Sequence, residues 1–94
     1  MTKSKRYASV WDAIETDSVA AENLKLRSML MMEIDRYFEA SNLTQSEAAK
    51  RMHTTQPRLN DVLQGKIEKC TIDRLVNMLA AVGRQVSMRV SDAA

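Results

Sequence analysis

The apolar residues between positions 18 and 41 recur at the spacing of an amphipathic helix. No glycine or proline interrupts this stretch, which follows the helix-start cluster Thr16-Asp17-Ser18. The pattern predicts one helix of about five turns, with Asn23 as the place to look for a break. Met29, Met31 and Met32 are expected to act as plain core residues. The apolar stripe consists of Leu24, Leu26, Leu30, Met31, Ile34, Tyr37 and Phe38.

Residues 43–66, LTQSEAAKRMHTTQPRLNDVLQGK, contain two further helix starts. Thr44 and Glu47 have the spacing of a capping box, in which each side chain accepts a hydrogen bond from the other residue's backbone N–H. A short helix with an apolar inner face is therefore predicted after Thr44. That inner face consists of Ala48, Ala49 and Met52.

A second short helix is predicted after the interruption His53-Thr54-Thr55. Thr55 can cap it, Pro57 falls in its first turn, where a missing N–H costs nothing, and Gly65 closes it as a left-handed cap. Its inner face consists of Leu59, Val62 and Leu63. Its free outer face carries the hydrogen-bonding side chains of Gln56, Arg58, Asn60 and Asp61. Together the two short helices and the turn predict a helix-turn-helix.

A last helix is predicted from Thr71, which can cap it, to Gly83, which ends it. Its apolar stripe consists of Ile72, Leu75, Val76, Leu79 and Val82. Residues 84–90 then change period and alternate, with Val86, Met88 and Val90 on one face. Alternation predicts a half-buried strand, which must pair outside its own chain because the sequence offers no second strand. Antiparallel pairing with a second copy about a two-fold axis is the economical arrangement.

The motifs LTQ-x-E-x-A, TQ-x-x-L and the closing Gly-Lys resemble the helix-turn-helix of phage-repressor-like (XRE-type) regulators. The leader AENLK, the GKI after the second helix and the segment DRLVNMLAAVG are similar to compact HigA-like antitoxins of toxin–antitoxin operons. The resemblance covers about residues 19–90. It implies a lambda-repressor-like bundle that binds operator DNA. If the chain is an antitoxin, the resemblance also implies a small toxin as a partner. The edge strand of the toxin's sheet is then an alternative partner for the C-terminal strand.

In such a motif the N-terminal residues of the second helix meet base edges in the major groove. Gln56 can pair with adenine, Arg58 can reach guanine or a phosphate, and Asn60 follows on the same exposed side. The resemblance implies a phosphate grip at Thr44 and Gln45. The predicted DNA-binding residues are Thr44, Gln45, Thr55, Gln56, Arg58, Asn60 and Lys66.

Three residues depart from the pattern of the family. His53 stands where relatives usually have the glycine of a left-handed turn, although histidine tolerates positive φ better than most residues. Thr54 replaces an apolar turn residue. Pro57 occupies a position where many relatives carry a base-reading side chain, which removes one contact.

Residues 1–15 form a basic and apolar arm. Lys3, Lys5 and Arg6 have no acidic neighbour, which is typical of a solvated tail or of an arm that follows phosphates or an acidic partner. Val10, Trp11 and Ile14 would share one face of a helical turn. This face either folds back on the core or serves as a partner-binding segment, since Trp is a favoured interface anchor.

Composition narrows the class of protein. The 94 residues make one small domain whose hydrophobic content of 45% and charged content of 28% are those of a soluble chain. A core of this size supplies only about 3–5 kcal/mol, which favours oligomerisation. The single Cys70, the lack of a signal sequence and the lack of a membrane-length apolar run predict a cytoplasmic protein.

The sequence offers little for catalysis. One histidine and one cysteine cannot assemble a zinc site, and the isolated Gly65 and Gly83 do not form a phosphate-cradling loop. We therefore expect no enzyme activity, no metal and no cofactor.

These patterns together predict an all-α bundle of four to five helices with a C-terminal β-strand that pairs across a homodimer. Residues 1–15 would form the arm, 16–83 the helix-turn-helix domain and 84–94 the dimerisation strand and tail. The expected function is transcriptional repression at a palindromic operator, most specifically by an antitoxin that represses its own operon and neutralises its toxin. A stand-alone repressor and a protein-interaction module without DNA binding are the alternatives.

Overall fold

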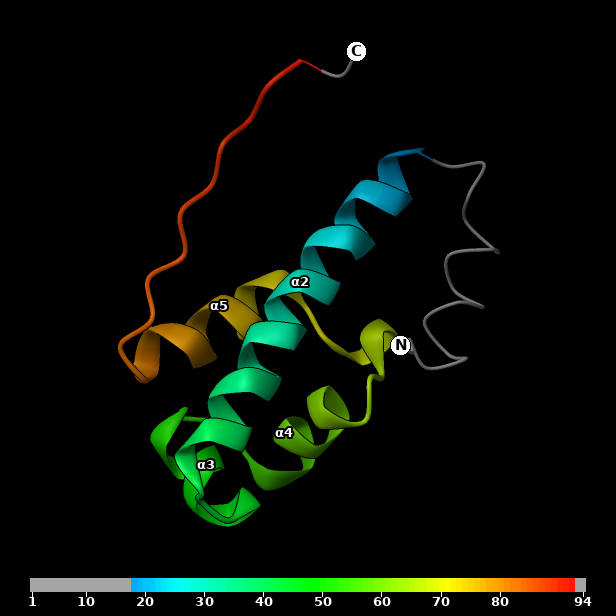
Figure 1. Ribbon diagram of the computed structural model, residues 1–94. Helices are drawn as coiled ribbons and strands as arrows, with labels where there is room; N and C mark the ends of the chain where they lie inside the picture. The colour runs from blue at the N-terminus through cyan, green and yellow to red at the C-terminus, as the bar shows by residue number, and fades with distance from the viewer. Residues whose placement is uncertain (1–17, 93–94) are drawn as a thin grey trace.

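A computed structural model of the chain describes residues 18–92. The elements are α2 (Ser18–Ser41), α3 (Gln45–Arg51), α4 (Gln56–Leu63), the 3-10 helix η1 (Ile67–Lys69) and α5 (Ile72–Ala81). The long α2 crosses the molecule, with α3 and α4 at its C-terminal end and α5 packed along it (Figure 1). The predicted all-α helix-turn-helix bundle is confirmed for this part of the chain.

Helix α2 is unbroken from end to end. At Asn23, where a break was considered, the side-chain oxygen accepts a hydrogen bond of 2.7 Å from Arg27 Nε one turn later. Met31 is buried, as expected, but Met29 and Met32 are 55% and 52% exposed. The expectation that these two methionines are core residues was wrong, because Met29 lines an open groove beside α5 and Met32 borders a hollow of polar side chains on α2.

The core forms where α2, α3, α4, η1 and α5 meet. It is aliphatic and sulfur-rich, with Tyr37 and Phe38 packed only against its edge. Its fully enclosed members are Met31, Ile34, Met52, Leu59, Ile67, Leu75 and Met78. Ile67 is 1% exposed, so the segment between α4 and α5 is a tight turn with this side chain buried in the core.

The inward face of α5 is shifted relative to the predicted one. Leu75 and Leu79 are buried as expected, but Met78 is their third partner. Ile72 and Val76 are only half-buried. The predicted stripe was therefore wrong for Ile72 and Val76. This edge of α5 is not covered and faces α2 and the C-terminal segment.

No strand forms in residues 18–92, so the predicted strand over 84–90 is absent from this single chain. Residues 84–92 instead run away from the end of α5 (Figure 1). The exposed fraction rises along them, from 37% at Val86 to 66% at Met88 and 87% at Val90. A strand needs a neighbouring backbone to complete its hydrogen-bond ladder, and the described chain supplies none.

Among the described helices, none combines the length and the apolar character that crossing a lipid bilayer requires.

Candidate nucleic-acid interface

The first helix of the motif begins with the predicted capping box. Thr44 Oγ1 accepts from the Glu47 N–H at 3.1 Å, and Glu47 Oε1 accepts from the Thr44 N–H at 3.0 Å. Hydrogen bonding of the Glu47 carboxylate with the Thr44 backbone, and next with its side chain, lowers the pKa of the Glu47 carboxyl. The box therefore holds the negatively charged Glu47 side chain at the start of α3, where it interacts favourably with the positive end of the helix dipole.

The turn between α3 and α4 passes through His53, whose φ is 56°. This left-handed conformation is the one that the resemblance implied at this position. The His53 and Thr54 backbone N–H groups donate to Lys50 O at 3.1 Å and Ala49 O at 2.9 Å, which closes the end of α3. The turn therefore holds α4 at a fixed angle to α3 although no glycine is present.

Helix α4 presents a polar outer face. Thr55 caps it by accepting from the Arg58 N–H at 3.3 Å, and Gly65, with φ 73°, follows its C-terminal end. Leu59 and Val62 are 0% and 4% exposed, so they anchor the inner face. The predicted contact residues Gln56 and Arg58 are exposed.

The remaining predicted DNA-binding residues lie in the same motif. Thr44 and Thr55 are exposed caps, whereas Gln45, Asn60 and Lys66 are half-buried. Residues 44–66 carry four cationic side chains, Lys50, Arg51, Arg58 and Lys66, against the acids Glu47 and Asp61. This excess suits a surface that approaches phosphates.

Lys66 is engaged within the protein. Its Nζ lies 3.8 Å from Asp61 Oδ1, and the two side chains are 35% and 28% exposed. Asp61 lies on the outer face of α4, but the set of predicted contacts did not include it. Its position in the motif was visible in the sequence, whereas its pairing with Lys66 across the end of α4 was not.

An open hollow of about 700 Å³ lies between the turn and α5. Arg58 lines it from α4, His53 from the turn, and Arg74, Asp73 and Asn77 from α5. Arg74 was not predicted as a site residue. Nothing in its local sequence distinguishes it from a solvated cation, because only the packing of α5 places it on the same hollow as Arg58.

The segment after α4 is fixed from two sides. Arg27 of α2 donates from Nη1 to Ile67 O at 3.1 Å and to Cys70 O at 3.2 Å. The Cys70 thiol donates to Lys66 O at 3.4 Å. Burial, with the nearby Asp61, raises the pKa of this thiol, so Cys70 stays protonated and acts as a buried hydrophobe.

The other predicted sites lie elsewhere. The proposed dimer residues Val86, Met88 and Val90 are all exposed on the C-terminal segment. Val10, Trp11 and Ile14 fall outside the described residues. Between residues 18 and 92, no three His, Cys, Asp or Glu side chains gather closely enough to hold a metal ion.

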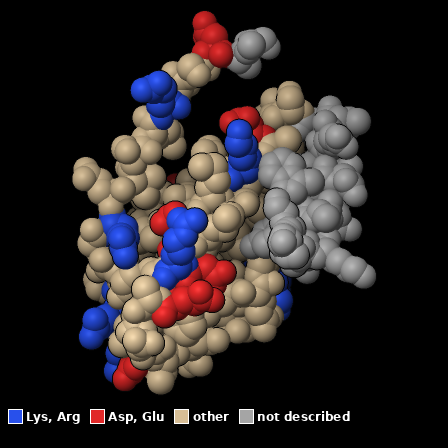
Figure 2. Space-filling view, viewed as in Figure 1, with Lys and Arg blue, Asp and Glu red and all other residues tan. Residues whose placement is uncertain are grey.

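Charge on the face shown in Figure 2 is mixed, with acids beside cations over α2. On α2, Arg36 forms an exposed ion pair with Glu33. This mixed face lacks the clustering of cations that is typical of a phosphate-binding surface.

A family model described as a helix-turn-helix domain matches residues 14–91. No curated protein matches the chain.

Proposed function

The chain belongs to the helix-turn-helix domain family, and from that premise we propose that it is a transcriptional repressor that binds operator DNA sequence-specifically. The proposal rests on the observation that α4 exposes its polar outer face. The cap at Thr55, the left-handed turn at Gly65 and the buried Leu59 hold this helix, and Gln56 and Arg58 are exposed on it. An exposed helix with an amide and a guanidinium in its first turn suits the major groove.

In this proposal the two ends of the motif position the protein on the DNA backbone. Thr44 and Gln45 at the start of α3 and Lys66 after α4 contact phosphates, and Asn60 lies beside the base-reading residues. A homodimer would place two α4 helices in successive major grooves, about 34 Å apart, on a palindromic operator. Residues 84–90 of the two copies would form the strand pair that joins them.

The narrower proposal is an antitoxin that represses its own operon. It is supported by the resemblance of residues 19–90 to HigA-like antitoxins and by the apolar Val10, Trp11 and Ile14, which lie outside the motif. Co-expression with each small neighbouring reading frame tests it. Rescue of growth from one such product, lost on Trp11→Ala, would establish the toxin partner.

DNA binding is tested with the DNA upstream of the gene, by fluorescence anisotropy over a salt series. Wild type is compared with the Gln56→Ala/Arg58→Ala double variant. Lys25→Ala is the matched control, because it removes a cation from the part of α2 that lies far from α3 and α4 (Figure 1). We expect tight, salt-sensitive binding that the double variant loses and the control keeps. Equal, sequence-independent binding by all three proteins would overturn the proposal.

A further inference from the structure

An apolar groove lies open between α2, α5 and the C-terminal segment. It has a volume of about 270 Å³. Its walls include Leu26, Met29 and Leu30 of α2, Ile72 and Val76 of α5, and Met88 of the C-terminal segment. The half-buried state of Ile72 and Val76 follows from this groove, because their side chains line it instead of the core.

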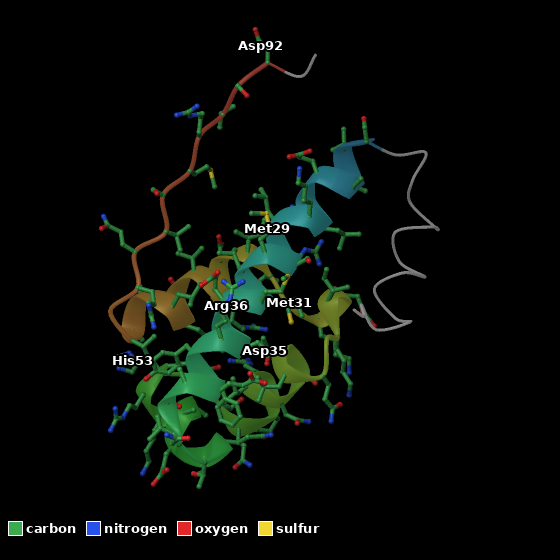
Figure 3. All side chains as sticks on the ribbon, viewed as in Figure 1. Met29, Met31, Asp35, Arg36, His53 and Asp92 are labelled. Atoms are coloured by element: carbon green, nitrogen blue, oxygen red, sulfur yellow. The ribbon has the colours of Figure 1, made fainter. Side chains whose placement is uncertain are left out.

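Met29 lies inside this groove and Met32 lies outside it, so the groove ends between them on α2. The two side chains are 55% and 52% exposed on the same helix, one turn apart. Met29 lines the apolar groove, whereas Met32 borders a polar hollow with Asp35, Arg36 and Glu39. Figure 3 shows Met29 on the stretch of α2 opposite the C-terminal segment. The exposed apolar surface is thus continuous from Met29 into the C-terminal segment, but does not extend to the hollow at Met32.

We propose that a second copy of this chain closes the groove. Residues 84–92 of the two copies pair antiparallel about a two-fold axis that passes through Met88, and the ribbon so formed covers the groove of each copy. The inference rests on the homodimer of the proposed function. It adds the register of the strand pair and the surface of α2 and α5 that the pair covers.

The charges at the two ends of the segment specify this register. With the axis at Met88, Val86 lies opposite Val90 of the second copy, and Arg84 lies opposite Asp92 of the second copy. Apolar residues then face apolar residues, and each end carries an opposite-charge pair. An axis at Ser87 puts Arg84 opposite Val90, and an axis at Arg89 puts Asp92 opposite Val86.

The exposure of the segment agrees with this arrangement. Val86, close to the body of the protein, is 37% exposed, and Val90, far from it, is 87% exposed. Val86 and Met88 already line the groove within one chain. A neighbouring strand would cover the exposed part of these side chains. It would also form the inter-strand backbone hydrogen bonds that the described chain alone does not make along this segment.

The first test is the association of the full-length chain, measured by analytical ultracentrifugation without DNA. We expect wild type to be a dimer. Met29→Glu raises its dissociation constant by at least about 100-fold, because a carboxylate enters an apolar interface. Val90→Glu does the same at a position too exposed to affect folding of the monomer. Met32→Glu, the matched control, leaves the dimer intact.

The second test addresses the register. Arg84→Asp and Asp92→Arg each turn two attractive pairs into two repulsive ones, so each variant alone should associate roughly tenfold more weakly. An equimolar mixture of the two variants restores opposite charges at both ends and should regain wild-type association. A monomeric wild type, equal effects of the Met29 and Met32 substitutions, or a mixture no stronger than either variant would overturn the inference. Because no DNA is present, a dimer that fails to bind DNA rejects the repressor and leaves this interface standing.

Discussion

Arg27 on α2 donates a hydrogen bond from Nη1 to the carbonyl oxygen of Cys70, 3.2 Å away and 43 residues later in the chain. The same nitrogen donates to Ile67 O at 3.1 Å. The two bonds enclose η1, the turn that connects α4 with α5. One side chain of α2 thereby holds the segment that leaves the candidate DNA-reading helix.

Replacing Arg27 with Ala should destabilise the protein by about 1–3 kcal/mol, because two partly buried carbonyl oxygens lose a charged donor. Urea unfolding followed by circular dichroism measures the change. Arg36→Ala is the control, since the exposed pair of Arg36 with Glu33 should contribute less than about 1 kcal/mol. Equal losses of unfolding free energy in the two variants would show that the hydrogen bonds from Arg27 to Ile67 and Cys70 stabilise the protein no more than an exposed ion pair does.

The capping box predicts a pH dependence of stability. Hydrogen bonds from Thr44 lower the pKa of Glu47 from its ordinary value of 4.5. A carboxyl with a lower pKa in the folded state stabilises the protein above its unfolded pKa and loses that stabilisation as the pH falls through the folded pKa. Glu47→Gln keeps an accepting oxygen but cannot titrate.

We therefore expect the stability advantage of wild type over Glu47→Gln to be full at pH 6 and to shrink steadily below about pH 4.5. Urea unfolding of both proteins across pH 3–6 measures it. A difference that stays constant down to pH 3 would mean that the charge of Glu47 is irrelevant to the cap.

What the sequence predicted well is local. The caps Thr44, Thr55 and Thr71 each bond the backbone N–H of the residue three positions on, so the signal and its partner lie within one turn. The exposed Gln56 and Arg58 follow from the same short-range pattern, because the periodicity of α4 separates its inner and outer faces.

The features that sequence reasoning missed depend on packing between distant elements. Met29 and Met31 belong to one methionine cluster in the sequence, but Met31 is 2% exposed in the core and Met29 is 55% exposed on an open groove beside α5. That Arg74 and Arg58 line one hollow likewise depends on how α5 packs against the motif. The strand over 84–90 was predicted from alternation, but alternation does not supply the second backbone that a ladder requires.

His53 offers a test of turn strain. Its φ of 56° is one that β-branched residues rarely adopt, and its side chain is exposed. His53→Val should destabilise the protein by about 1–2 kcal/mol without loss of core contacts. His53→Gly should change stability by less than about 1 kcal/mol, since relief of strain is offset by a freer unfolded chain. Thermal unfolding of the three proteins checks the order, and a valine variant as stable as wild type would contradict it.

The pair of Asp61 and Lys66 should limit non-specific DNA binding. Asp61 places a negative charge on the outer face of α4 and lies 3.8 Å from Lys66, one of the proposed phosphate contacts. Asp61→Asn removes the repulsion and releases the lysine, so affinity for all DNA sequences should rise by up to about 1 kcal/mol. The slope of log K against log salt should steepen by roughly one unit.

Lys66→Gln should act in the opposite direction, weakening binding evenly across sequences and flattening the slope by about one unit. In the double variant the effect of Asp61→Asn should shrink, because the lysine that it would release is gone. Anisotropy titrations with operator and random duplexes over a salt series measure all four proteins. If Asp61→Asn instead weakens binding to the operator alone, Asp61 reads a base there, as a carboxylate that accepts from cytosine N4 would do.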